Sequence, residues 1–175
     1  LSADRLKSAL RVLVTWSKPH PEFAGMELTA VAQRMGVSAE AAAQRLLPAG
    51  AIYFSMHEDD VRRILSFEET MIGSDGLPHD AFPHPRLWGT FPRVLGHYAR
   101  EVGLFDLETA VHKMTGLPAT KFGLTGRGLI QPGCYADIVM FDAQHIQDRA
   151  TFEQPLQNAA GVRNVAKVLS HFPDD

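Results

Sequence analysis

The chain is poor in cysteine, with Cys134 as the only thiol in 175 residues. A single cysteine excludes an internal disulfide and is typical of a reducing compartment, so we expect a cytoplasmic location. No apolar run approaches the length of about 20 residues that a membrane-spanning helix needs. We also expect no signal peptide, because the first residues lack its layout. The sequence therefore predicts a globular protein that depends on its hydrophobic core.

The chain also lacks any dense basic run. Its net charge of −3 arises from 17 basic and 20 acidic residues. Nucleic acid and anionic membranes are therefore poor candidates as partners. Hydrophobic residues make up 45% and charged residues 21% of the chain, as is ordinary for a globular protein.

Hydrophobic periodicity predicts an alternation of strands and helices in the first half. β-Branched runs predict strands, and apolar residues at helical spacing between capping and breaking residues predict helices. We expect strands at 11–16 and 51–56 and a third ending at Asp75, with helices at 27–35, 39–47 and 58–65.

The second half begins with helices and ends in a β segment. Helices are expected at 93–102 and 107–115, followed by a short one that ends near Gly123. The Pro-Gly pair at 132–133 predicts a type II turn. We expect it to join 128–131 and 136–142 as a β-hairpin.

The stretch Thr70-Met-Ile-Gly-Ser-Asp-Gly76 carries the most chemical information. Its apolar residues predict the end of a buried strand in a parallel sheet. An aspartate at the carboxyl end of such a strand lies where α/β barrels and open sheets place their chemistry. The alternative is a turn aspartate that only bonds its own backbone, which is common before glycine.

Several separated motifs agree in order with one known family. They are Ser74-Asp-Gly-Leu-Pro-His-Asp80, His84-Pro-Arg86, Gly89-Thr-Phe-Pro-Arg93, Met114-Thr-Gly-Leu-Pro-Ala119 and Pro132-Gly-Cys-Tyr-Ala-Asp-Ile-Val-Met-Phe-Asp142. From about Thr15 to about Phe152 the chain resembles the C-terminal portion of the N-acyl-D-amino-acid deacylases (D-aminoacylases) of the amidohydrolase superfamily. The loop at 74–80 points to this branch, whereas the later motifs are general to amidohydrolases.

The resemblance implies an α/β fold: the C-terminal part of a (β/α)₈ TIM-type barrel with an inserted lid segment, followed by strands of a small β-sandwich. It divides the chain into three parts. Residues 1–57 would form the lid segment before the last barrel strand. Residues 58–122 would hold that strand, ending at Asp75, and the C-terminal helices. Residues 123–175 would belong to the sandwich.

The resemblance also implies a function. In such enzymes the last barrel strand delivers an aspartate to the metal centre, and Asp75 matches it. Asp75 would act as general acid/base on zinc-bound water, and could ligate a second metal ion. The expected reaction is zinc-dependent hydrolysis of a small-molecule N-acyl-D-amino acid to a D-amino acid and a carboxylate.

The family's His-x-His pair and its further Cys and His ligands do not occur in this sequence. Catalytic zinc usually has three protein ligands, so zinc would be bound mainly by residues missing from this chain. We therefore expect the chain alone to be inactive and to associate with a missing N-terminal barrel half or with itself. The alternatives are a non-catalytic structural fragment or subunit, and another amide hydrolase of dihydropyrimidinase or isoaspartyl-dipeptidase type.

Three further residues are candidates for substrate binding. Arg86 could bind a substrate carboxylate with its guanidinium fork or could hold its own loop in place. His79 is expected to pack in the loop or face the substrate, rather than join Asp75 and His84 in a metal set, because their spacing fits no standard zinc pattern. Ser17 follows the first expected strand and could approach a substrate.

Overall fold

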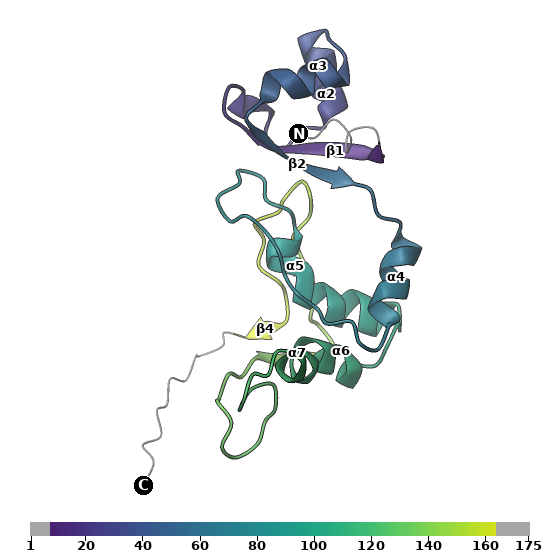
Figure 1. Cartoon of the computed structure of the whole chain (residues 1–175), viewed down its shortest axis with the longest axis vertical. Helices are drawn as coiled ribbons and strands as arrows, with labels where there is room; N and C mark the ends of the chain where they lie inside the picture. Colours follow the sequence, from purple (N-terminus) through teal and green to yellow (C-terminus); the bar gives the residue numbers. More distant parts are fainter. Residues whose placement is uncertain (1–7, 164–175) are drawn as a thin grey trace. The chain divides into compact units, whose positions relative to one another are not determined.

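The computed structural model describes residues 8–163 and divides into two units that interleave along the chain (Figure 1). The first unit takes in residues 8–61, 75–88 and 150–157, and the second takes in 62–74, 89–149 and 158–163. The chain therefore passes from the second unit to the first between Ser74 and Asp75. The division at 57 and 122 that the sequence suggested stays a prediction.

An antiparallel ribbon is the framework of the first unit. It pairs β1 (Arg11–Ser17) with β2 (Ala49–Phe54), as the β-branched runs predicted. The register runs from Arg11 opposite Phe54 to Ser17 opposite Ala49, with an irregularity between Val14 and Trp16. Thr15 is the extra residue there, so the ribbon has a β-bulge at this point.

The helices α2 (Leu28–Met35) and α3 (Ala39–Leu46) pack on this ribbon (Figure 1). Gly36 ends α2 in the left-handed conformation, and the hydroxyl of Ser38 caps α3 by accepting the Ala41 N–H at 3.2 Å. Both signals were read correctly from the sequence. The buried residues of this core are Val12, Val14, Leu28, Val31, Ala32, Ala42, Ala43 and Leu46.

The loop that follows Asp75 is attached to the ribbon through Phe82. The Phe82 N–H donates to the carbonyl of Thr15, the bulge residue, at 3.1 Å. The Phe82 ring lies over Gly25, whose φ is +82°; a Cβ there would be 2.8 Å from the ring. The close approach and the left-handed backbone both require glycine at this position.

The helices of the second half continue from one another. The division of the chain at residues 61–62 falls within α4 (Glu58–Ser66), and α5 (Arg86–Arg93) leads into the π-helix η2 (Val94–Glu101). The expected helix at 93–102 therefore begins earlier, at Arg86. Pro92 lacks an N–H and crowds the carbonyl four residues earlier, which accounts for the wider helix that follows.

The next two helices were predicted closely. Asp106 caps α6 (Leu107–Met114) by accepting the Thr109 N–H at 2.8 Å, and α7 (Gly116–Lys121) ends just before Gly123. Gly123 has a φ of +65°, as a glycine after a helix C-terminus commonly does.

Two β expectations are wrong. Residues 70–76 form no strand, since the two sheets in the described part of the chain are β1–β2 and β3–β4. A parallel strand needs neighbours, and residues 8–163 provide none for this segment. The turn at Gln131–Cys134 does form, with the Cys134 N–H donating to Gln131 O at 3.2 Å, but it joins no hairpin.

The strand after this turn finds its partner near the end of the described chain. β3 (Met140–Phe141) pairs with β4 (Val162–Arg163). The remainder of the tail that the sequence analysis considered lies outside the described residues. Within residues 8–163, no helix has the length and apolar character to cross a membrane.

The approach of Phe82 to Gly25 gives a stability prediction. Gly25→Ala should cost more unfolding free energy than Gly36→Ala, measured by urea denaturation. Both glycines have positive φ, so alanine costs about 1–2 kcal/mol of backbone strain at each. Only Gly25 also lies under a ring, because nothing is within 4 Å of a Cβ at Gly36. Equal losses would contradict the packing described here.

Candidate active site

Asp75 and Arg86 form the central contact of the candidate site. The Arg86 Nη2 donates to the Asp75 carboxylate, and its Nε donates to the Asp75 carbonyl at 3.2 Å. One guanidinium therefore fixes both the backbone and the side chain of Asp75. The two side chains are 73% and 49% exposed for Asp75 and Arg86 respectively, so the pair is open to solvent.

His84 supports Arg86 from the same loop. The Arg86 backbone N–H donates to His84 Nδ1 at 3.0 Å, which assigns the ring proton to Nε2 when the imidazole is neutral. The ring meets Phe152 edge-on, with centroids 5.2 Å apart. Burial lowers the pKa of His84 to about 4, and the charge of Arg86 acts in the same direction against the opposing effect of Asp75.

A cavity of about 810 Å³ lies beside this loop within the first unit. Its wall is partly apolar and carries the polar side chains of Asp80, His84 and Arg86. It is lined by Ser8, Thr15, Trp16, Gly50, Ala51, Ile52, Tyr53, Phe54, Ser55, Met56, Leu77, Asp80, His84, Arg86 and Phe152. Asp75 is not among the lining residues, but it is hydrogen-bonded to Arg86, which is one of them.

The β-bulge shapes one end of the cavity. Thr15 is 3% exposed, and its hydroxyl is the one buried side-chain polar atom without a hydrogen-bond partner among residues 8–163. A Cβ at Gly50 would lie 2.5 Å from this hydroxyl oxygen, so glycine gives it room. A buried hydroxyl with no protein partner fits a site that takes a water or a polar group of a ligand.

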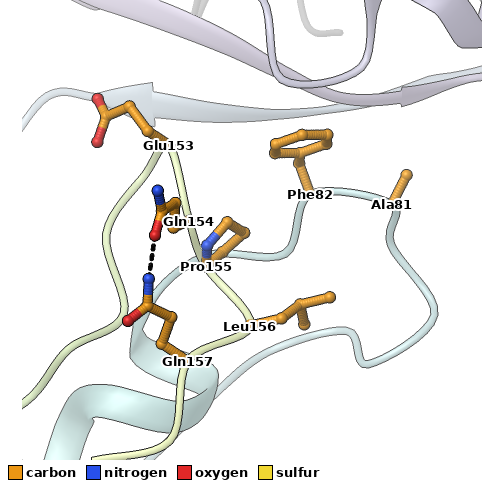
Figure 2. Close-up of a pocket in the computed structure, with 7 residues that line it drawn as sticks. All are labelled: Ala81, Phe82, Glu153, Gln154, Pro155, Leu156 and Gln157. Carbon is orange, nitrogen blue, oxygen red and sulfur yellow. Dashed lines mark hydrogen bonds between the residues drawn. The ribbon is translucent and has the colours of Figure 1, made fainter.

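A smaller cavity of about 290 Å³ lies on the same loop (Figure 2). Ala81 and Phe82 face the segment 153–157, in which the Gln157 side-chain amide donates to that of Gln154. Glu153 is the one titratable residue among the seven that line it, so the cavity lacks the arginine and histidine that accompany Asp75.

The other residues that the sequence suggested for substrate binding, Ser17 and His79, do not line the larger cavity. Ser17 is buried, and its hydroxyl donates to the Leu46 carbonyl at 2.7 Å and accepts the His20 N–H at 3.2 Å. It does not line either cavity. His79 is exposed on the loop after Asp75. A substrate contact by Ser17 or His79 stays a prediction, and Arg86 is the candidate that the structure brings to Asp75.

Two contributors to the cavity were missed by the sequence analysis. Phe152 contacts both the Phe54 ring, in a tilted arrangement with centroids 4.6 Å apart, and the edge-on His84 ring. Thr15 lies in the middle of a strand, and the alternation of residues along that strand does not distinguish it from its neighbours. No local motif marks either residue, because Phe152 arrives from a distant part of the chain and the bulge depends on tertiary pairing.

The sequence and the fold of the chain both match a known class of protein. The model of the amidohydrolase family matches residues 21–167, and solved structures of D-aminoacylase show the α/β amidohydrolase fold. The chain belongs to the amidohydrolase family.

Curated relatives narrow the likeness to one branch. The chain is 60% identical over 165 residues to the D-aminoacylase of Alcaligenes xylosoxydans xylosoxydans, covering 94% of this chain and 34% of that protein. It is 56% identical to the N-acyl-D-glutamate deacylase of the same organism, covering 88% and 32%. The chain thus spans about a third of the length of these relatives, and the resemblance to the N-acyl-D-amino-acid deacylases is confirmed.

A solved structure agrees with this likeness. The N-acyl-D-glutamate deacylase of Bordetella bronchiseptica, complexed with zinc and a phosphonate that mimics the tetrahedral intermediate, superimposes with a TM-score of 0.90. It is 51% identical, and the match covers 93% of this chain and 34% of that one.

The described residues were compared with the ligand sets that zinc requires. In the described range, no three His, Cys, Asp or Glu side chains come together as a metal site. Asp75 instead pairs with Arg86, and His84 Nδ1 is taken by a backbone N–H. Whether Asp75, His79 or His84 contributes to a metal site stays a prediction.

The half-buried His84 gives a pH prediction. Its folded pKa of about 4 lies below the ordinary 6.5, so the unfolded chain binds more protons between these values. This contribution to stability is complete above about pH 6.5 and is lost as the pH falls towards 4.

The change is His84→Asn, whose amide oxygen can still accept the Arg86 N–H. Compared with this variant, the unmodified chain should lose on the order of 1 kcal/mol more unfolding free energy between pH 7 and 4, since partial exposure reduces the effect. Urea denaturation at each pH measures it, with His79→Asn as the exposed control. Parallel pH profiles for all three proteins would refute the prediction.

Proposed function

We propose that this chain supplies the acid/base residue of a zinc-dependent hydrolase that converts N-acyl-D-amino acids to a D-amino acid and a carboxylate. The observation that carries the proposal is the position of Asp75, held by Arg86 beside the 810 Å³ cavity in a chain 60% identical to a D-aminoacylase.

Asp75 would move one proton during the reaction. Water adds to the carbonyl carbon of the N-acyl group, and the ionised Asp75 carboxylate accepts its proton. The C–N bond then breaks, and Asp75 returns the proton to the leaving amine nitrogen. An exposed aspartate held through its backbone carbonyl and through one carboxylate oxygen suits this role, because its geometry is fixed while the side chain remains open to solvent.

Arg86 would bind the carboxylate of the substrate. Its guanidinium lines the cavity and is half-exposed, so it can contact a ligand while it bonds Asp75. Its planar fork of donors matches a carboxylate. The same residue would thus set the distance between the substrate and the acid/base.

The residues that line the cavity favour a substrate with an uncharged side chain. Tyr53, Phe54 and Met56 line it, and Arg86 is the one arginine or lysine among its lining residues in the described structure. A substrate with an acidic side chain would bring a second carboxylate to a site with a single guanidinium. The cavity therefore favours an apolar D-amino acid over D-glutamate or D-aspartate.

Zinc ligands would come from outside the described residues, so we propose that the chain alone is inactive. Native mass spectrometry with metal analysis separates this from the non-catalytic alternative. A zinc-containing assembly larger than the chain supports the hydrolase. A metal-free species of 19.3 kDa, and no deacylase activity on adding the rest of the enzyme, supports a structural fragment.

The acid/base role is tested by Asp75→Asn in the zinc-loaded enzyme that contains this chain. Loss of a general acid/base should lower kcat for an N-acetyl-D-amino acid by about 10²- to 10⁴-fold. Zinc content should be measured in parallel. Asp59→Asn, on the exposed start of α4, is the matched control. Full activity of Asp75→Asn with zinc bound would overturn the role.

The role of Arg86 is tested by Arg86→Met in the same enzyme. Loss of a guanidinium–carboxylate contact should raise KM for an N-acetyl-D-amino acid by at least about tenfold. An N-acetyl amine that lacks the carboxylate should show no such change. If kcat falls equally for both compounds and KM stays constant, Arg86 acts on Asp75 alone.

A further inference from the structure

Phe152 is a half-buried aromatic residue that the proposed reaction does not use. It lies in the segment 150–157, which belongs to the first unit, although the segments on either side of it, 89–149 and 158–163, belong to the second. Within the first unit its ring contacts both the ribbon and the loop that follows Asp75. A single side chain therefore joins three parts of this unit that lie far apart in the sequence.

On one side, Phe152 contacts the ribbon through Phe54 of β2. The two ring centroids are 4.6 Å apart, and the ring planes are tilted by 57°. The guanidinium of Arg11 in β1 lies over the Phe54 ring, 4.7 Å from its centroid, and its Nε donates to the Glu27 carboxylate at 2.5 Å. Because tilted ring pairs and cation–π contacts are both favourable, Phe54 is held in the ribbon and gives Phe152 a defined surface to pack on.

On the other side, Phe152 contacts His84. The two rings meet edge-on at 76°, with centroids 5.2 Å apart. An imidazole turns readily about its Cβ–Cγ bond, so a ring packed against it limits the directions in which its nitrogens point. Burial lowers the pKa of His84 to about 4, so the imidazole is neutral at pH 7 and its Nδ1 can accept a hydrogen bond.

The group that His84 Nδ1 accepts is the backbone N–H of Arg86, at 3.0 Å. Arg86 is the first residue of α5, and an N–H in the first turn of a helix has no acceptor within that helix. The guanidinium of the same residue holds Asp75 and lines the cavity. The contacts from Phe54 through Phe152 and His84 to Arg86 and Asp75 all lie within the first unit.

We propose that Phe152 is a positioning residue for Arg86. It confines the His84 ring against the ribbon, and His84 in turn fixes the backbone from which the Arg86 guanidinium reaches the substrate carboxylate. The effect on substrate binding rests on the proposed function of Arg86. The effect on His84 and on the Arg86 N–H stands on the contacts alone.

The first test is hydrogen exchange measured by NMR on the 175-residue chain, which needs neither zinc nor activity. Phe152→Leu keeps an apolar side chain but removes the ring, whereas Phe152→Tyr keeps the ring. Exchange of the Arg86 amide hydrogen should become about 2- to 10-fold faster in Phe152→Leu, as the loss of one aromatic pair predicts, and should stay within about twofold of its original rate in Phe152→Tyr.

Phe122→Leu is the matched control, because Phe122 is 70% exposed and lies in the second unit. It should leave the Arg86 amide unchanged. Unchanged exchange of this amide in Phe152→Leu overturns the proposal. An equal rise at every amide of the first unit also overturns it, since Phe152 would then serve only general stability.

The second test is steady-state kinetics in the zinc-loaded enzyme that contains this chain. Phe152→Leu should raise KM for an N-acetyl-D-amino acid by about 2- to 10-fold, with kcat within about twofold of its original value. An N-acetyl amine with the same side chain but no carboxylate should keep its KM, and Phe152→Tyr should restore KM for the amino acid. An equal rise in KM for both compounds would show that Phe152 packs directly on the substrate, and this result or an unchanged KM overturns the positioning role.

The two proposals fail in different ways. If Arg86→Met leaves KM unchanged, the proposed role of Arg86 fails, while hydrogen exchange still decides whether Phe152 holds the contact between His84 and Arg86. If Arg86→Met raises KM and Phe152→Leu does not, the positioning role fails alone.

Discussion

The position of Asp75 depends on contacts made by residues outside its own segment. Residues 70–76 form neither helix nor strand, so no local ladder of hydrogen bonds fixes them. Arg86 holds both the backbone and the carboxylate of Asp75 within the first unit. Since an exposed carboxylate gains little from packing, the geometry of the site is only as definite as this contact. In the second unit, Lys113 holds the segment 67–72.

The contacts of Arg86 and Lys113 contribute differently to the free energy of unfolding, because the first is exposed and the second is buried. The Asp75–Arg86 pair is exposed, and such pairs contribute about 0–1 kcal/mol to stability. Removing the Lys113 ammonium would leave carbonyls without their donor in a buried place, at about 1–3 kcal/mol for each one that water cannot reach. Arg86 therefore serves the orientation of Asp75, whereas Lys113 serves the stability of the second unit.

Local signals in the sequence were sufficient for most helices and for the first ribbon. Ser38 and Asp106 cap the helices they were expected to cap, and Gly36 ends α2 as expected. These features depend on residues within four positions of one another, so they can be recognised in the sequence alone. The resemblance likewise singled out Asp75 and Arg86, although it left open whether Arg86 binds substrate or holds its loop.

What failed depends on partners far along the chain. The strand expected at 70–75 needs parallel neighbours, and without them the Ile72 N–H bonds to α6 instead. The hairpin expected at 128–142 gave way to pairing with Val162 and Arg163. Three further features also depend on residues far along the chain: the bulge at Thr15, the ring contacts of Phe152 and the burial of Lys113. A motif can identify a reactive residue because the chemistry is local. The support of that residue is distributed through the fold, and only the structure shows it.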